Sequence, residues 1–216
     1  MDISKAITFV FEDDDWLVKV LLGALITLIP IFGQLALLGY MIAIIRNVKA
    51  GDPNPLPRWD ALGTFFMDGL MVWLASLVYA LPLILFMCVI GFIWIPPIVA
   101  GEDAAPVLAG LSGVVTAGVS CLIGLYGLLL ALVTPVIQIR YAEAGEIGAC
   151  LRFGKVFGMA FSQIGPVIIS QLLVWVAGGI VGSILGSVTF GLLALPVAFW
   201  TQALAAHLYG QIARRA

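Results

Sequence analysis

The sequence predicts an all-α protein, a polytopic membrane helix bundle with five or six hydrophobic segments plus interfacial amphipathic helices. The first observation behind this prediction is composition: 62% of the 216 residues are hydrophobic and only 10% are charged. A soluble domain has about 45–50% apolar and roughly 25% charged residues. The second is charge placement, because long runs contain no Asp, Glu, Lys or Arg; these runs are 20–45, 69–101, 104–139 and 156–213. Each can hold at least one helix of about 20 residues across a ~30 Å hydrocarbon layer.

The chain is expected to form a single integral membrane domain over residues 1–216 that begins with a short amphipathic segment. Residues 1–15 predict an interfacial helix followed by an acidic cap. Segment 16–45 would measure about 45 Å as one straight helix, which is too long for an untilted crossing. Pro30 interrupts this segment midway. It is therefore either one kinked span or a hairpin of two short helices, and both alternatives remain open.

The remaining elements follow a proline-rich loop at 51–57. Residues 57–69 predict an interfacial helix, because Pro57 suits a first helical turn and the apolar residues after it fall mostly on one side. Four transmembrane helices are then expected, over 70–95, 108–139, 162–185 and 190–211.

The placement of basic residues predicts the orientation of these spans. They occur in three clusters: Arg46, Lys49 and Arg58; Arg140, Arg152 and Lys155; and Arg214 with Arg215. Loops rich in Lys and Arg stay in the cytoplasm, and all three clusters can do so if single spans alternate after residue 58. The C-terminus is then cytoplasmic. The side of the N-terminus depends on whether segment 16–45 crosses once or forms a hairpin.

Several classes of function are disfavoured by the composition. The net charge of −2 and the few basic residues argue against a surface that binds nucleic acid. Three cysteines stand singly, at Cys88, Cys121 and Cys150, and provide no redox or metal-binding pair. No nucleophile–base pair or phosphate-binding glycine loop is recognisable. We therefore expect no enzyme activity, no catalytic residue, no cofactor and no metal.

Polar residues inside the expected spans are few and mostly uncharged. Gln34, Gln171 and Gln202 are the deepest of them. One interpretation is a polar lining for an uncharged solute or a site for a lipid headgroup. The structural alternative, which we favour, is hydrogen bonding between helices, worth about 0.6–2 kcal/mol for each contact.

Small residues recur every four positions on two of the expected spans. Gly178, Gly182 and Gly186 form one ridge, and a second comprises Ala109, Gly113, Ala117 and Cys121. In lipid, such ridges let helices approach closely and gain van der Waals contact. The partner helix belongs either to the same chain, which we favour, or to another subunit.

The region from Trp16 to Leu70 also carries a recognisable pattern, which begins with the preceding Asp15. Its residues are Asp15-Trp16, Lys19, Leu22-Gly23-Ala24-Leu25, Leu28-Ile29-Pro30-Ile31, Gly39-Tyr40, Arg46, Gly51, Leu56-Pro57-Arg58-Trp59-Asp60, Phe65-Phe66 and Asp68-Gly69. This pattern resembles the prokaryotic membrane family known as domain of unknown function 4013. The resemblance covers about a quarter of the chain and implies a protein of a bacterial or archaeal cytoplasmic membrane, but no activity. The candidate motif residues are Trp16, Gly39, Tyr40, Pro57, Trp59, Asp60, Asp68 and Gly69.

Two functions are consistent with this sequence. The first is a non-enzymatic structural or accessory subunit that packs with other membrane proteins or with itself; it is favoured by the small-residue ridges and the absence of charge at mid-membrane depth. The second is a passive channel, an uncoupled transporter or a lipid-handling protein built around the break at Pro30 to Gln34. Membrane lipid is an expected partner in both cases.

Overall fold

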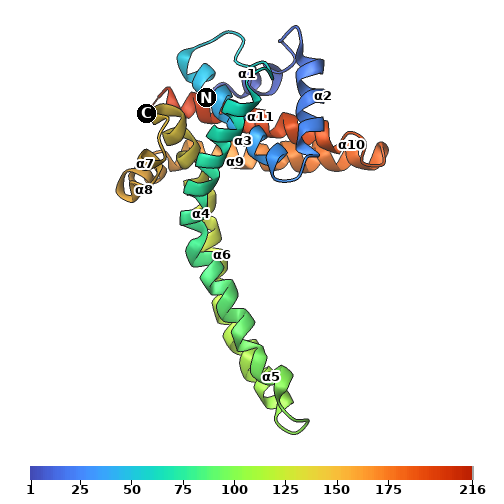
Figure 1. Ribbon diagram of the computed structural model, residues 1–216, viewed down its shortest axis with the longest axis vertical. Coiled ribbons are helices and arrows are strands. Elements are labelled where there is room, and N and C mark those ends of the chain that lie inside the picture. Colours follow the sequence, from blue (N-terminus) through green and yellow to red (C-terminus); the bar gives the residue numbers. More distant parts are fainter. Residues whose placement is uncertain (216) are drawn as a thin grey trace. The chain divides into compact units, whose positions relative to one another are not determined.

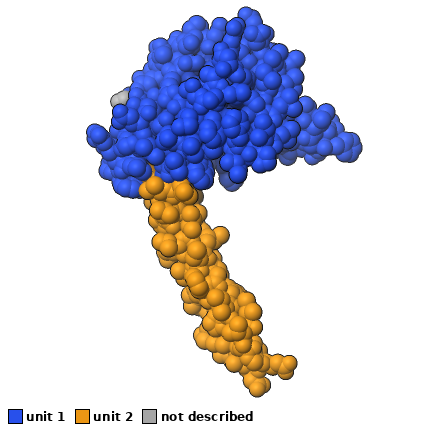
Figure 2. Space-filling model, in the orientation of Figure 1, with its two compact units in different colours: residues 1–75, 132–216 blue, residues 76–131 orange. Residues whose placement is uncertain are grey.

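A computed structural model of the protein describes residues 1–215, and these residues form helices and turns without a β-strand (Figure 1). The chain divides into two compact units (Figure 2). The core unit comprises residues 1–75 and 132–216, and the hairpin unit comprises residues 76–131. The helices in chain order are α1 (Ile3–Thr8), α2 (Trp16–Thr27), α3 (Phe32–Ala50), α4 (Leu62–Ile93), α5 (Ile95–Val99), α6 (Ala105–Ala144), α7 (Ile147–Cys150), α8 (Phe153–Ser162), α9 (Ile164–Val176), the π-helical turn η1 (Ala177–Val181), α10 (Gly182–Val188) and α11 (Ala194–Ala213).

Three stretches of helix are long and apolar enough to cross a membrane: Leu62–Val99, Ala105–Ala144 and Ile164–Val188. They indicate a multi-pass membrane protein, because the hydrocarbon layer requires about 20 consecutive apolar residues. Helix α11, which overlaps the span expected at 190–211, is not among the three.

Helix α11 is instead the central helix of the core unit. Every residue from 203 to 210 is buried, and α11 packs against α1, α2, α3 and α9. Small residues permit this packing: a Cβ on Gly210 would lie 2.6 Å from Cβ of Val48 on α3. Such a distance is shorter than van der Waals contact, so the approach of α3 to α11 requires glycine at this position.

Segment 16–45 contains two helices rather than one continuous kinked helix. Helix α2 ends at Thr27, α3 begins at Phe32 and the two helices pack against each other. Pro30 lies in the turn between them, where a ring in place of the amide hydrogen prevents helix continuation. A Cβ on Gly33 would meet the carbonyl oxygen of Ile26, so glycine allows the chain to reverse tightly.

The helix expected at 57–69 differs from the one observed. Residues 57–61 are not helical, and α4 begins at Leu62 and continues without interruption to Ile93. The loop remains extended because its carbonyl groups accept hydrogen bonds from side chains of α2 and α3, as described below. No helix-breaking feature separates residues 69 and 70, so the amphipathic segment and the following apolar segment form a single helix.

The hairpin unit consists of two antiparallel helical segments joined by α5 and a short turn. The Tyr126 hydroxyl donates to the carbonyl oxygen of Tyr79 (2.7 Å), and the Ser112 hydroxyl donates to that of Ile93 (2.9 Å). Outside this seam the side chains are apolar and exposed; Leu85 is 65% and Val114 is 75% exposed. Such a surface suits lipid or other apolar helices.

Candidate functional site

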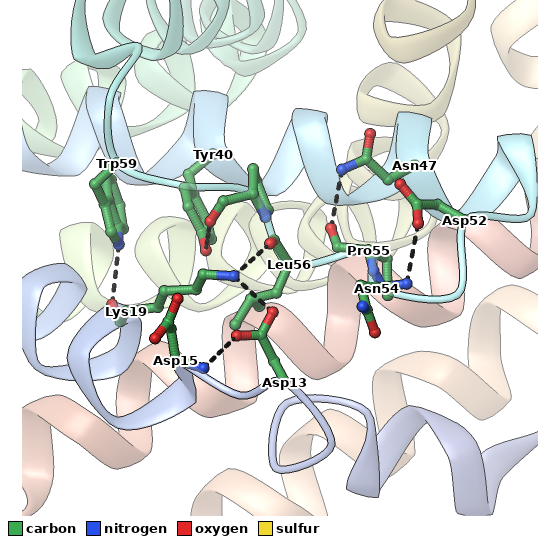
Figure 3. Close-up of polar contacts among 11 residues, drawn as sticks. Asp13, Asp15, Lys19, Tyr40, Asn47, Asp52, Asn54, Pro55, Leu56 and Trp59 are labelled. Carbon is green, nitrogen blue, oxygen red and sulfur yellow. Dashed lines mark hydrogen bonds and ion pairs between the residues drawn. The ribbon is translucent and has the colours of Figure 1, made fainter.

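A buried ion pair lies where the N-terminal segment meets α2 and the loop before α4 (Figure 3). Nζ of Lys19 is 2.6 Å from Oδ2 of Asp13, and it also donates to the carbonyl oxygen of Leu56 at 3.0 Å. Both charged side chains are about nine-tenths buried. Because a buried charge is costly unless it is paired and hydrogen-bonded, this pair fixes three segments of the chain relative to one another.

Two aromatic motif residues complete the attachment of this loop. The Tyr40 hydroxyl of α3 donates to the carbonyl oxygen of Pro57 (2.8 Å), and Nε1 of Trp59 donates to that of Lys19 (2.9 Å). The two rings stack with centroids 4.0 Å apart and planes 11° apart. The loop is therefore held by hydrogen bonds from both helices and by ring stacking.

A second polar cluster connects α3, α4 and α6 within the core unit. The carboxylate of Asp68 accepts hydrogen bonds from Nη1 of Arg46 (2.5 Å) and from the Tyr141 hydroxyl (2.9 Å). The Arg46 guanidinium also lies over the Tyr141 ring, with Cζ 5.7 Å from the ring centroid. Asp68 is thus engaged by two donors from two helices, which indicates a structural role rather than a free acid or base.

The two motif glycines lie where α3 crosses the start of α4. A Cβ on Gly39 would meet the backbone of Phe65, and a Cβ on Gly69 would meet the carbonyl oxygen of Leu35.

The last two motif residues are more peripheral. Asp60 is exposed, and the Trp16 ring packs edge-on against Phe11 with centroids 5.1 Å apart.

The core unit contains an open cavity of about 460 Å³. It lies between α3, the start of α4, the end of α6 and α11, with mostly apolar walls that include Trp73. Three amide side chains line it: Gln34, Gln138 and Gln202. The combination of apolar walls with a few amides suits an uncharged or amphipathic molecule rather than an ion.

The structure brings together two of the three glutamines considered as a polar lining. Gln34 and Gln202 line the cavity, whereas Gln171 lies elsewhere and accepts a hydrogen bond from the Tyr209 hydroxyl (3.2 Å). Gln138 joins the cavity instead. The role of Gln138 is hard to predict from the sequence, because it lies near the end of an expected span and the residues that face it come from distant segments.

The three glycines of the ridge on the η1–α10 segment do not all contact another helix. A Cβ on Gly178 would lie 3.4 Å from Cγ2 of Thr201, and one on Gly182 would lie 3.8 Å from Cγ1 of Val197, so both face α11. No atom lies within 4 Å of the Cβ position of Gly186 among the described residues. The ridge therefore packs within the chain at its first two glycines.

Metal-binding clusters and thiols are two further kinds of group that could support chemistry. Within residues 1–215, no group of three or more His, Cys, Asp and Glu side chains is placed to hold a metal ion. Cys150 in α7 is fully buried, and burial raises the pKa of its thiol to about 11. A thiol that remains protonated at neutral pH is a weak nucleophile.

Comparison with known proteins identifies the family of this chain. No curated protein and no solved structure gives a significant match. A family model, however, matches residues 22–191, which include most of the sequence pattern and also extend well beyond residue 70. The chain therefore belongs to the family described as Protein of unknown function (DUF4013).

Proposed function

We propose that this chain is a non-enzymatic integral protein of a prokaryotic cytoplasmic membrane that serves as a structural or accessory subunit. In this proposal five or six hydrophobic segments enter the membrane, interfacial helices lie at its surface, and the basic clusters keep the C-terminus in the cytoplasm. The partners are lipid and either other membrane proteins or further copies of this chain. The observation that carries the proposal is the unfilled small-residue ridge of the hairpin unit.

This ridge consists of Ala109, Gly113, Ala117 and Cys121, one helical turn apart along α6. Ala117 and Cys121 are exposed, and no atom of residues 1–215 outside the helix's own backbone lies within 4 Å of the Cβ position of Gly113. The polar seam to α4 uses other residues, including Ser112. Small residues at four-residue spacing favour close approach of a second helix in lipid, so the ridge suits a helix from another membrane protein or from a second copy of this chain.

Native mass spectrometry of the protein extracted in mild detergent tests this proposal. We expect a complex with stoichiometric protein partners or copies, and we expect Gly113→Leu to dissociate it by filling the ridge. Gly91→Leu is the matched control, because among the described residues no atom lies within 4 Å of the Cβ position of Gly91 either, but Gly91 lies on α4. A monomeric chain without protein partners, or equal dissociation by both variants, would contradict the proposal.

The glutamine-lined cavity favours a second candidate, a lipid-handling protein or a passive path for an uncharged solute. Gln34 and Gln202 are exposed and Gln138 is half-buried, so their amides can reach a molecule in the cavity. Lipid analysis of the purified protein tests this candidate. Gln202→Leu should reduce a specifically retained neutral lipid, whereas Gln163→Leu, outside the cavity, should not. Unchanged lipid content in both variants would argue against it.

A further inference from the structure

A second cavity, of about 520 Å³, lies at the junction of the N-terminal segment, the C-terminal end of α3 and the end of α11. Unlike the glutamine-lined cavity, it is lined mainly by charged and polar side chains. Its cations are Lys5, Arg214 and Arg215, and its acidic residues are Asp2 and Asp52. Segments nearly 210 residues apart in the sequence therefore contribute cations to one cavity.

The three cations have no protein partner within the described part of the chain. The ion pairs of residues 1–215 involve Lys19, Arg46, Lys49 and Arg140 instead. Among the hydrogen bonds of these same residues, none is donated by the side chain of Lys5, Arg214 or Arg215. Three neighbouring positive groups without anionic partners repel one another, and a bound anion would relieve that repulsion.

The two carboxylates of the cavity are already engaged by backbone amides. Oδ1 of Asp2 accepts from the backbone nitrogen of Lys5 (3.0 Å) and so caps α1. Oδ1 of Asp52 accepts from the backbone nitrogen of Asn54 (3.0 Å). These contacts hold the acidic groups in local turns, and the cations are left as the groups available to a ligand.

The wall of the cavity is fixed by a reciprocal contact between the two ends of the chain. The backbone nitrogen of Asp2 donates to Oε1 of Gln211 (2.6 Å), and Nε2 of Gln211 donates to the carbonyl oxygen of Asp2 (2.9 Å). His207, which is 4% exposed, lies beneath this contact with Nδ1 3.2 Å from Nε2 of Gln211. Lys5 and the two arginines are thus brought together by ordered backbone rather than by chance on a flexible surface.

We propose that this cavity binds a phosphate group, carried either by an anionic phospholipid headgroup or by a soluble phosphate ester. Arginine matches phosphate geometry with a planar fork of donors and is more weakly hydrated than lysine, whose ammonium adds a point charge. The volume exceeds what one phosphate requires, which leaves room for the group that carries it. This site is independent of the proposed accessory role, because it uses neither the hairpin ridge nor the glutamine-lined cavity.

The test is a binding titration of the full chain in an uncharged detergent. The probes are short-chain phosphatidylglycerol, its zwitterionic phosphatidylcholine counterpart, and glycerol phosphate. We expect phosphatidylglycerol to bind more tightly than phosphatidylcholine, and the double variant Arg214→Gln/Arg215→Gln to weaken its binding about tenfold or more. Competition by glycerol phosphate identifies a soluble phosphate ester as the ligand, and its failure to compete identifies the lipid.

Two further variants separate a specific site from general electrostatics and from misfolding. Arg152→Gln/Lys155→Gln removes the same charge from exposed positions outside the cavity and should leave the affinity unchanged. Asp52→Asn keeps an acceptor for Asn54 but removes a negative charge from the cavity, and it should tighten binding severalfold. Equal weakening by the two double variants, no tightening with Asp52→Asn, or absence of binding by every probe would overturn the proposal.

Discussion

Gly39 on α3 and Gly69 on α4 lie against each other at the point where the two helices cross. A Cβ on Gly69 would lie 2.9 Å from the backbone nitrogen of Gly39, so the two backbones are in direct contact. The same crossing places Asp68, adjacent to Gly69, within reach of Arg46. The Asp-Gly pair of the family pattern thus serves two purposes, with the glycine permitting the approach and the carboxylate linking the helices.

Replacing Gly69 with alanine should destabilise the core unit. The added methyl group would push against backbone atoms of α3, and overpacking of this kind costs about 1–3 kcal/mol. Thermal unfolding in detergent should show a lower midpoint for Gly69→Ala. Gly63→Ala on the same helix is the control, since its Cβ position is open and alanine favours helix. A Gly69 variant as stable as the control would rule out the close crossing.

Removing only the cation of the buried ion pair should be more harmful than removing both charges. Lys19→Met leaves the carboxylate of Asp13 buried without its partner, and breaking such a pair costs about 3–5 kcal/mol. The double variant Asp13→Asn/Lys19→Met should recover much of that loss. Chemical denaturation of the three proteins in detergent measures the difference. A double variant that is no more stable than Lys19→Met would show that the pair is not buried as observed.

The contacts of Asp68 predict that its charge matters to stability and that the charge of Asp60 does not. Asp68→Asn weakens two charge-assisted hydrogen bonds and should cost about 1–3 kcal/mol. Asp60→Asn is the matched control at an exposed position and should change stability by less than about 0.5 kcal/mol. Thermal unfolding in detergent compares the two. Equal effects would contradict the different roles of these carboxylates.

The three cysteines should differ in their reactivity for two physical reasons. Cys88 and Cys121 are exposed on the hairpin unit and Cys150 is buried. In intact membranes a polar maleimide should label none of them rapidly, because lipid shields the first two, and burial with a pKa of about 11 protects the third.

Detergent solubilisation and denaturation distinguish these two forms of protection. A small apolar thiol reagent added in detergent should modify Cys88 and Cys121 but not Cys150, and denaturation should expose all three. Single-cysteine variants analysed by mass spectrometry report each site separately. Rapid labelling of Cys88 or Cys121 by the polar maleimide in intact membranes would show that the hairpin unit does not lie in lipid.

The sequence predicts the all-α class and the location of most apolar helices because charge and proline act locally. Pro30 indicates a break between α2 and α3 without knowledge of any tertiary contact. In contrast, the start of α4 depends on hydrogen bonds from Lys19, Tyr40 and Trp59, which come from segments far apart. Local patterning at 57–69 therefore suggested a separate interfacial helix where the structure has a loop and then one long helix.

The candidate sites were less accessible from sequence than the helices. The composition of the spans makes the glutamines stand out as polar residues. Which of them share a cavity, however, depends on how each helix is rotated. Gln138 lines the cavity, and Gln171 does not. The sequence also does not show that α11 is the central helix of the core unit, because an apolar helix at the centre of a protein and an apolar helix in lipid have similar sequences. Burial of residues 203–210 by α1, α2, α3 and α9 distinguishes them.

The dependence of the core unit on α11 has a consequence for biosynthesis. Helix α11, the main packing partner of the N-terminal helices, begins at Ala194. The side chain of Gln211 in this helix accepts the hydrogen bond from the backbone nitrogen of Asp2. Contacts over such sequence separations form late. Helices α1 to α3 therefore leave the ribosome long before their core can close, and a chain that terminates before Ala194 keeps an unpaired apolar face. Truncated chains of this kind should be substrates for membrane quality-control proteases.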